Sequence, residues 1–151
     1  MKIKKLLASS LCCVSCVIML SACGGGEVSY KDGSYEGKSE VYENEDGSDE
    51  GNGYAVVNIT IKDGQISDCT LQTFDPDGNL KDENYGKASG STVANKDYYN
   101  KAQKAVASCE EYATMLINNG QLDGIDAISG ATINYNEFIE ATENALAQAV
   151  K

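Results

Sequence analysis

The segment from residue 54 to residue 74 constrains the fold of this chain more than any other. Tyr54 to Ile61 is rich in β-branched residues, and Ile66 to Phe74 continues as a second extended run. Lys62 to Gln65 lies between them and carries Asp-Gly at its centre, a strong signal for a tight turn between antiparallel strands. The sequence therefore predicts a β-hairpin whose apolar face must be covered by the remaining elements.

Two amphipathic helices are predicted after the hairpin. Apolar side chains recur at helical spacing over residues 97–118, and Asn118-Asn119-Gly120 is a suitable stop. A second stripe runs over residues 136–150, with Asn134 or Asn136 as its N-cap. We therefore predict an α+β domain: a small antiparallel sheet, based on the hairpin, with two amphipathic helices packed on one face.

The segments around these elements are predicted to be an opening strand, loops and turns. Residues 30–41 begin with a turn at Asp32-Gly33 and continue as an extended run. Residues 43–52 are acidic and Gly-rich, which indicates a solvated loop; they lack the ligand spacing of an EF-hand. Residues 75–78 form a turn, residues 79–95 show no periodicity, and residues 122–128 are a short connector with some extended character.

The N-terminus has the features of a lipoprotein secretory signal. Three lysines in the first five residues precede an apolar run from Leu6 to Leu20, and Leu20-Ser21-Ala22-Cys23 follows the lipobox pattern. The apolar run is shorter than the roughly 20 residues of a membrane-spanning helix. We therefore predict a signal peptide over residues 1–22, lipid attachment at Cys23 and a tether over residues 23–29. The domain of residues 30–151 would then be anchored on the extracytoplasmic face of the cell membrane.

The charge and composition exclude several classes of function. Without the leader, nine lysines stand against 23 acidic residues, a formal charge of −14, so nucleic acid is not an expected partner. The chain has no histidine and no arginine. Their absence removes Ser-His-Asp and Cys-His catalysis, histidine-based zinc sites and arginine clamps on phosphate. We expect neither a catalytic site nor a metal site.

Cys69 and Cys109 are the cysteines that accompany Cys23 in the mature chain. Outside the cytoplasm such a pair can oxidise to a disulfide. Alternatively, the two residues are small buried apolar side chains. The sequence leaves both open, because it does not show whether their Cα atoms come within about 7 Å of each other.

A run of small residues, Asp126-Ala127-Ile128-Ser129-Gly130-Ala131-Thr132, precedes the second predicted helix. A helix N-terminus has unpaired N–H groups and a partial positive charge, which suit a phosphate. Gly130 lets the backbone approach a ligand closely, and Thr132 places a hydroxyl in that field. Because no general base accompanies Thr132, we expect an acceptor that another enzyme modifies. Taken alone, the run also fits an ordinary turn with a helix cap.

The order of motifs along the chain resembles the FMN-binding domain family. This family occurs in flavin-carrying subunits of the sodium-pumping quinone reductase and Rnf complexes and in extracellular electron-transfer lipoproteins. The similar motifs are Asp-x-x-Ser-Gly-Ala-Thr at residues 126–132, Asp-Gly-x-Tyr-x-Gly at residues 32–37, the hairpin of residues 58–66, and Asn84-Tyr85-Gly86-Lys87. The resemblance covers most of the chain after Cys23.

The resemblance implies that FMN is the cofactor. It also implies that a flavin transferase takes FMN phosphate from FAD and esterifies it onto Thr132. Asp126, Ser129, Gly130 and Ala131 match the other motif positions, whereas Asn134 replaces the Ser or Thr that many members carry there. The implied protein is an electron carrier rather than an enzyme, with a membrane donor such as a quinol-linked dehydrogenase. The alternative is a flavin-free ligand-binding or surface-antigen lipoprotein on the same fold.

Aromatic and basic residues near these motifs are candidates to contact a flavin. Aromatic faces stack favourably, and the candidate tyrosines are Tyr85, Tyr98, Tyr99, Tyr112 and Tyr135. Lys87 and Lys96 are candidates to pair with the phosphate or with flavin carbonyl groups. For each of these residues, an ordinary core or solvated position is the alternative interpretation.

Overall fold

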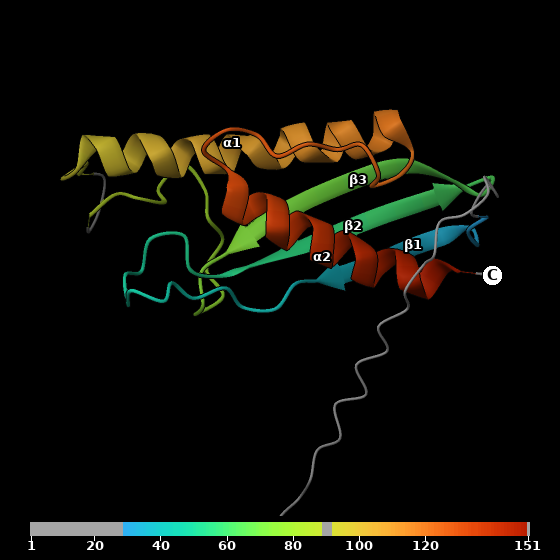
Figure 1. Ribbon diagram of the computed structural model, residues 1–151, viewed down its shortest axis with the longest axis horizontal. Helices are drawn as coiled ribbons and strands as arrows, with labels where there is room; N and C mark the ends of the chain where they lie inside the picture. The colour runs from blue at the N-terminus through green and yellow to red at the C-terminus, as the bar shows by residue number, and fades with distance from the viewer. Residues whose placement is uncertain (1–28, 89–91, 151) are drawn as a thin grey trace, which may run out of the picture.

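The structure is a computed structural model that describes residues 29–88 and 92–150. Its elements are β1 (Gly33–Lys38), β2 (Tyr54–Lys62), β3 (Gln65–Phe74), α1 (Lys96–Asn119) and α2 (Thr132–Ala149). The strands form one antiparallel sheet in the order β1-β2-β3, and both helices lie on the same side of it (Figure 1). The α+β prediction is therefore confirmed. The predicted signal peptide, Cys23 and all of the tether except Ser29 lie outside the described residues.

The hairpin forms where the sequence predicts it. Lys62 pairs with Gln65, so Asp63 and Gly64 make a two-residue connection between β2 and β3. Their φ angles are 54° and 78°. Positive φ at both positions is what the type I′ turn requires, and Asp-Gly tolerates it better than other dipeptides. The turn thus fixes the register of the central strand pair.

One face of the sheet carries the core. Alternate residues of β2 point inward and are almost fully buried: Ala55, Val57, Ile59 and Ile61. A bulge beside Thr60 shifts the alternation along β3, so that both Ile66 and Cys69 are buried. The helices cover these side chains, because α1 packs on β3 and α2 packs on β1 and β2.

The packing of α2 on β1 is close enough for backbone to meet backbone. Gly37 is buried in β1. A Cβ atom added to it would lie 2.5 Å from the backbone nitrogen of Ala145 and closer still to the carbonyl oxygen of Ala141. Ala141, Ala145 and Ala149 are fully buried and recur every four residues. Small side chains on one stripe of α2, together with a glycine on the strand, therefore allow the close approach.

Polar side chains of α2 also cover the edge strand. The amide groups of Asn144 and Gln148 donate to the carbonyl oxygens of Lys38 and Glu36, at 2.8 and 2.7 Å. Satisfying backbone groups at a sheet edge blocks pairing with another chain. α2 thus holds β1 both through close packing and through side-chain hydrogen bonds.

The two ends of the domain meet at the C-terminal end of α2. Tyr30 forms an antiparallel bridge with Val150, and the backbone nitrogen of Lys31 donates to the carbonyl oxygen of Ala149 at 2.8 Å. The segment that follows the predicted tether is therefore fixed beside the end of the last helix.

α2 begins four residues earlier than predicted, at Thr132 instead of Asn136. The predicted caps are also wrong, because the N-cap is Ala131, which makes no side-chain cap hydrogen bond. Asn134 lies inside the helix, is buried, and its Nδ2 donates to the carbonyl oxygen of Ala105 on α1 at 2.8 Å. Asn134 therefore joins the two helices instead of ending one of them. By contrast, α1 agrees with its prediction to within one residue at each end.

The connecting segments are irregular, as predicted for residues 43–52 and for residues 79–88 and 92–95. The loop of residues 43–52 is held by Asn44, whose Nδ2 donates to the carbonyl oxygen of Glu50 and, at 3.1 Å, to Oδ1 of Asn52. Residues 122–128 form turns and bends without strand pairing. In the described part of the chain, no cluster of three or more His, Cys, Asp or Glu is placed to hold a metal ion. No helix there has the length and hydropathy to cross a membrane.

Cys69 and Cys109 are free thiols in the structure, and both are buried. Of the two alternatives left by the sequence, the structure thus shows a pair of buried small side chains. Burial, aided by the charge of Asp68, raises the pKa of the Cys69 thiol to about 12. Cys109 Sγ lies 3.8 Å from Oγ1 of Thr73, and burial raises its pKa as well.

We predict that both thiols react slowly with an alkylating reagent in the folded protein and rapidly after unfolding, because only the exposed thiolate is nucleophilic. Peptide mass spectrometry after timed alkylation would measure this for the Cys69 and Cys109 peptides separately. Equally rapid labelling in the folded and unfolded states would contradict the burial described here.

Candidate functional site

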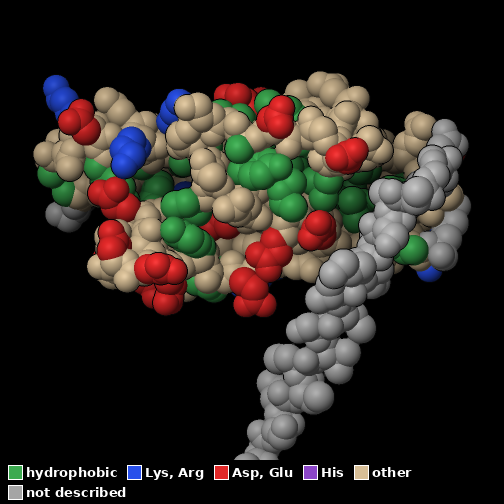
Figure 2. All heavy atoms as spheres, viewed as in Figure 1, with side chains coloured by type: hydrophobic (Ala, Val, Ile, Leu, Met, Phe, Trp, Pro, Cys, Tyr) green, Lys and Arg blue, Asp and Glu red, His purple; other side chains and the backbone are tan. Residues whose placement is uncertain are grey.

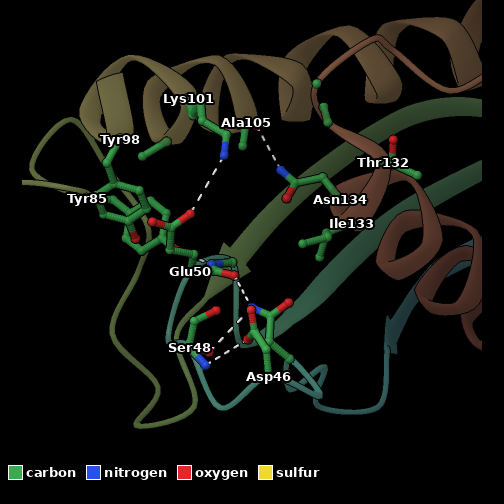
Figure 3. Close-up of a pocket in the computed structure, with 15 residues that line it drawn as sticks. Asp46, Ser48, Glu50, Tyr85, Tyr98, Lys101, Ala105, Thr132, Ile133 and Asn134 are labelled. Atoms are coloured by element: carbon green, nitrogen blue, oxygen red, sulfur yellow. Dashed lines mark hydrogen bonds and ion pairs between the residues drawn. The ribbon is translucent and has the colours of Figure 1, made fainter. Parts of the chain in front are cut away.

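An open cleft of about 380 Å³ lies between α1, the N-terminus of α2 and the loop of residues 43–52 (Figure 3). Tyr85 and Tyr98 form one end of it, and the start of α2 forms the other. Its volume is within the roughly 300–1,000 Å³ of small-molecule sites. The cleft thus combines aromatic side chains with a helix terminus.

The start of α2 brings three of the five predicted motif residues into the cleft. Gly130, Ala131 and Thr132 line it. Gly130 has a φ of 82°, a left-handed conformation that glycine adopts without strain. Thr132 is exposed, so its hydroxyl is accessible. Asp126 and Ser129 are also exposed but are not among the residues that line the cleft.

The N-terminus of α2 has no internal partner for its first amide groups. Ala131 at the N-cap supplies no side-chain acceptor, and the first turn contains no acidic residue. The leading N–H groups of a helix have no acceptor within the helix, and the macrodipole places partial positive charge there. This end of the cleft is therefore suited to an anion.

Tyr112 holds the motif in place from the core. Its hydroxyl accepts a hydrogen bond from the backbone nitrogen of Ile128 at 2.8 Å and donates to the carbonyl oxygen of Ala131 at 3.3 Å. Its ring is fully buried and stacks on Phe138 with centroids 5.3 Å apart. The expectation that Tyr112 packs against a flavin ring is therefore wrong, because the core already covers its ring. Tyr135 has a similar supporting role, donating to the carbonyl oxygen of Ile125 at 2.9 Å.

Of the predicted tyrosines, Tyr85 and Tyr98 are the pair that lines the cleft. Their rings meet edge to face, with centroids 6.5 Å apart. The Tyr85 hydroxyl accepts a hydrogen bond from the backbone nitrogen of Gly51 at 3.2 Å, and burial raises its pKa. Tyr99 donates to the carbonyl oxygen of Glu83 and does not line the cleft. Tyr85 and Tyr98 are thus the aromatic groups available to a ligand.

Two lysines of α1 that the sequence patterns did not indicate lie at the cleft or beside the motif. Lys101 lines the cleft and forms an ion pair across its rim with Glu50, at 3.7 Å. The Nζ atom of Lys104 lies 3.3 Å from the position that a Cβ would take on Gly130. Lysine side chains on this face of the molecule gather mainly over the N-terminal half of α1, amid widespread acidic residues (Figure 2).

The two lysines predicted to pair with a phosphate lie elsewhere. Neither Lys87 nor Lys96 lines the cleft, and Lys87 Nζ donates to Oδ1 of Asn84 at 3.0 Å. A sequence signal for the two lysines of α1 does exist, because Lys101 follows Tyr98 by three residues and Lys104 follows Lys101 by three. This spacing places them along neighbouring turns of one helix side.

Comparison with protein families matches residues 51–147 to the FMN-binding domain. The chain belongs to the FMN-binding domain family. Its cofactor is therefore FMN, and the chain is a flavoprotein. The matched segment runs from the loop before β2 almost to the end of α2, and so it includes both ends of the cleft.

Comparison with solved structures supports the fold of this FMN-binding domain. The crystal structure of the CPE2226 protein from Clostridium perfringens superposes with a TM-score of 0.56 at 23% sequence identity. The match covers 80% of this chain and 88% of the other. At this identity the likeness establishes a shared fold. The chain has no match among curated proteins.

The residues of the FMN-binding domain cleft fit the chemistry of FMN. The uncapped amides of α2, with Lys104 beside Gly130, match a phosphate. Tyr85 and Tyr98 offer aromatic surface for an apolar ring at the opposite end of the cleft. Gly130 leaves room where a side chain would approach Lys104. Phosphate and ring thus have separate partners within one cavity.

Proposed function

We propose that this protein is a lipid-anchored electron carrier on the extracytoplasmic face of the cell membrane, with FMN joined to Thr132 by a phosphoester. The observation that carries the proposal is that Thr132, an exposed threonine at the uncapped N-terminus of α2, is among the residues that line the cleft. A covalent bond suits this location, because a freely bound flavin would be lost by diffusion outside the cell.

The residues around Thr132 would stabilise the phosphate. The amide groups of the first turn of α2 point to an anion at this position, and Lys104 adds a positive charge beside Gly130. Lys101 can turn from Glu50 toward the phosphate at small cost, because an exposed ion pair contributes only about 0–1 kcal/mol. The negative charge of the domain is thus offset locally where the phosphate would bind.

We assign the attachment reaction to a separate flavin transferase, because the chain has no histidine and no described residue forms a hydrogen bond to the Thr132 hydroxyl that would mark it as a base. Thr132 Oγ1 forms a bond to the phosphorus of the FMN half of FAD. The pyrophosphate bond to that phosphorus breaks, AMP leaves, and the hydroxyl proton passes to solvent. The product retains the flavin ring unchanged.

FMN, when bound, supplies the capacity to accept and release electrons. The protein would position the cofactor. Tyr85 and Tyr98 line the end of the cleft where the ring would lie, and the buried Tyr112 hydroxyl holds the backbone of Ile128 and Ala131 through hydrogen bonds. The electron donor would be a membrane protein such as a quinol-linked dehydrogenase. The acidic surface favours partners with basic docking faces, and salt should weaken that preference.

The experiment that tests this proposal is coexpression of the full chain with a flavin transferase, followed by intact-mass measurement. We expect an FMN-sized addition to the wild-type chain and none in Thr132→Ala. Thr114→Ala is the matched control, because Thr114 is an exposed threonine on α1, away from the cleft. It should carry the addition at the wild-type level.

Two results would contradict the proposal. An addition that persists in Thr132→Ala would place the bond elsewhere. A wild-type chain without the addition, from cells that modify another FMN-binding domain protein, would favour a flavin that is bound without a covalent bond. The lipid anchor is tested separately by radiolabelled palmitate incorporation, which should be lost in Cys23→Ala.

A further inference from the structure

Glu137 is a buried carboxylic acid in α2 that has no hydrogen-bond partner. Its residue is 4% exposed, and neither Oε1 nor Oε2 accepts a hydrogen bond from any described group. Within the same residues, no cation lies within ion-pair distance of it. Natural proteins rarely bury an acid in this way, because an unpaired carboxylate in a low-dielectric interior is costly.

Glu137 lies directly behind the wall of the cleft. It follows Ile133 by one helical turn, and Ile133 lines the cleft. Ile133 also contacts Gly51: a Cβ on Gly51 would lie 2.8 Å from Ile133 Cδ1. Lys81 Nζ donates to the carbonyl oxygen of the same Gly51 at 3.0 Å. Glu137 also interacts electrostatically with Tyr85, which lines the cleft, so a charge in the cleft and a charge on the acid can influence each other.

The ionisable groups that act on Glu137 come from each segment around it. Lys81 and Tyr85 follow β3, Cys109 lies on α1, and Glu140 lies on α2 itself. The inward-facing residues of β2 are apolar. Burial has the largest effect and raises the pKa of Glu137 to about 7, while the positive charge of Lys81 opposes the rise. Glu137 is therefore expected to titrate closer to neutral pH than an exposed glutamate does.

We propose that Glu137 is a redox-linked proton site, which takes up a proton from solvent when the cofactor in the cleft gains an electron and releases it when the electron leaves. The inference rests on the proposed function only in that FMN occupies this cleft. An added negative charge in the cleft makes the nearby carboxylate less favourable, so its proton affinity rises. By reciprocity, protonated Glu137 stabilises the reduced protein. The electron and the proton enter separately, and the proton offsets the charge of the electron.

The test is the midpoint potential of the flavin-loaded full chain, measured by spectroelectrochemistry on both sides of pH 7. In wild type we expect a bend in the plot of potential against pH, with steeper pH dependence than in Glu137→Gln. Glu143→Gln is the matched control, because it removes the same charge from an exposed position of the same helix. It should retain the wild-type bend. Any protonation of the flavin itself is common to all three proteins and cancels in the comparison.

Lys81→Gln provides a second, directional test. Loss of the positive charge that favours the carboxylate should move the bend to higher pH. Identical potential–pH plots for wild type and Glu137→Gln, with flavin bound in both, would overturn the redox linkage and leave the proposed function intact.

The flavin-free protein separates the two proposals. Infrared difference spectra should show a carboxyl group that titrates near pH 7 in wild type and is absent from Glu137→Gln. If Glu137 titrates in the range of an exposed glutamate instead, the proton site does not exist. A chain that binds no flavin would overturn both the proposed function and the redox linkage of Glu137, regardless of the pH at which the Glu137 carboxyl group titrates.

Discussion

Replacing Gly37 with alanine is expected to destabilise the fold by more than about 3 kcal/mol, which exceeds the usual 1–3 kcal/mol cost of overpacking. The new methyl group would collide with backbone atoms of Ala141 and Ala145, and backbone cannot change rotamer to avoid it. Trimming Ala141 gives no relief, because the contact is with its carbonyl oxygen. α2 must then move off β1, and Thr132 moves with it. Chemical unfolding monitored by circular dichroism would measure the loss.

Gly47→Ala is the control for this prediction. Gly47 has no atom within 4 Å of an added Cβ, but its φ is 75°. We therefore expect only the cost of a left-handed alanine, roughly 1 kcal/mol. If Gly37→Ala is no less stable than Gly47→Ala, the close packing of α2 on β1 is wrong. If Gly37→Ala does not fold at all while Gly47→Ala does, the loss of stability is at least as large as the stability of the whole domain, which agrees with the prediction.

The second large effect is a loss of folding stability with rising pH, which we expect Glu137 to cause. Its pKa rises from 4.5 in the unfolded chain to about 7 in the folded one. Between these values the folded state binds more protons, so raising the pH favours unfolding. The stability that protonated Glu137 contributes is complete below pH 4.5 and is lost as pH rises through about 7. With 1.36 kcal/mol for each pKa unit, the total loss is about 3 kcal/mol.

Urea unfolding of the flavin-free protein at a series of pH values measures this loss. The free energy of unfolding of wild type, minus that of Glu137→Gln, should fall between pH 4.5 and about 7 and stay constant above it. The buried amide of the variant has its own cost, but that cost does not vary with pH. Glu143→Gln should follow wild type throughout. Parallel curves for wild type and Glu137→Gln would exclude a buried acid.

The elements governed by local patterns were predictable from the sequence. Asp63-Gly64 fixes the hairpin turn, and the α1 stripe with its Gly120 stop fixes that helix. The start of α2 was missed because asparagine is a strong N-cap residue in isolation. In the fold, Asn134 finds its partner on α1 instead. That partner is 29 residues away, so no local rule includes it.

The site was predictable in its motif but not in its surroundings. The loop ending in Thr132 is contiguous in sequence, whereas the cleft is lined by residues from four parts of the chain. From the sequence, Lys101 and Lys104 look like ordinary solvated residues; the fold places Lys101 in the cleft and Lys104 beside Gly130. Glu137 would be expected at the surface as a charged residue. Its spacing from Asn134 and Ala141 nevertheless places it on the buried side of α2.

The bridge between Tyr30 and Val150 would determine how the domain is oriented relative to the membrane under the proposed anchoring. α2 has 18 residues and a length of about 27 Å, and its two ends are the bridge and the cleft. With the proposed anchor at Cys23, the cofactor would lie at the N-terminal end of α2, the end farther from the lipid. The seven residues from Cys23 to Ser29 span at most about 25 Å. Under the proposed function, the domain would therefore have to reorient on this short tether to bring the cofactor to a donor in the bilayer, and reorient again to reach an acceptor away from the membrane.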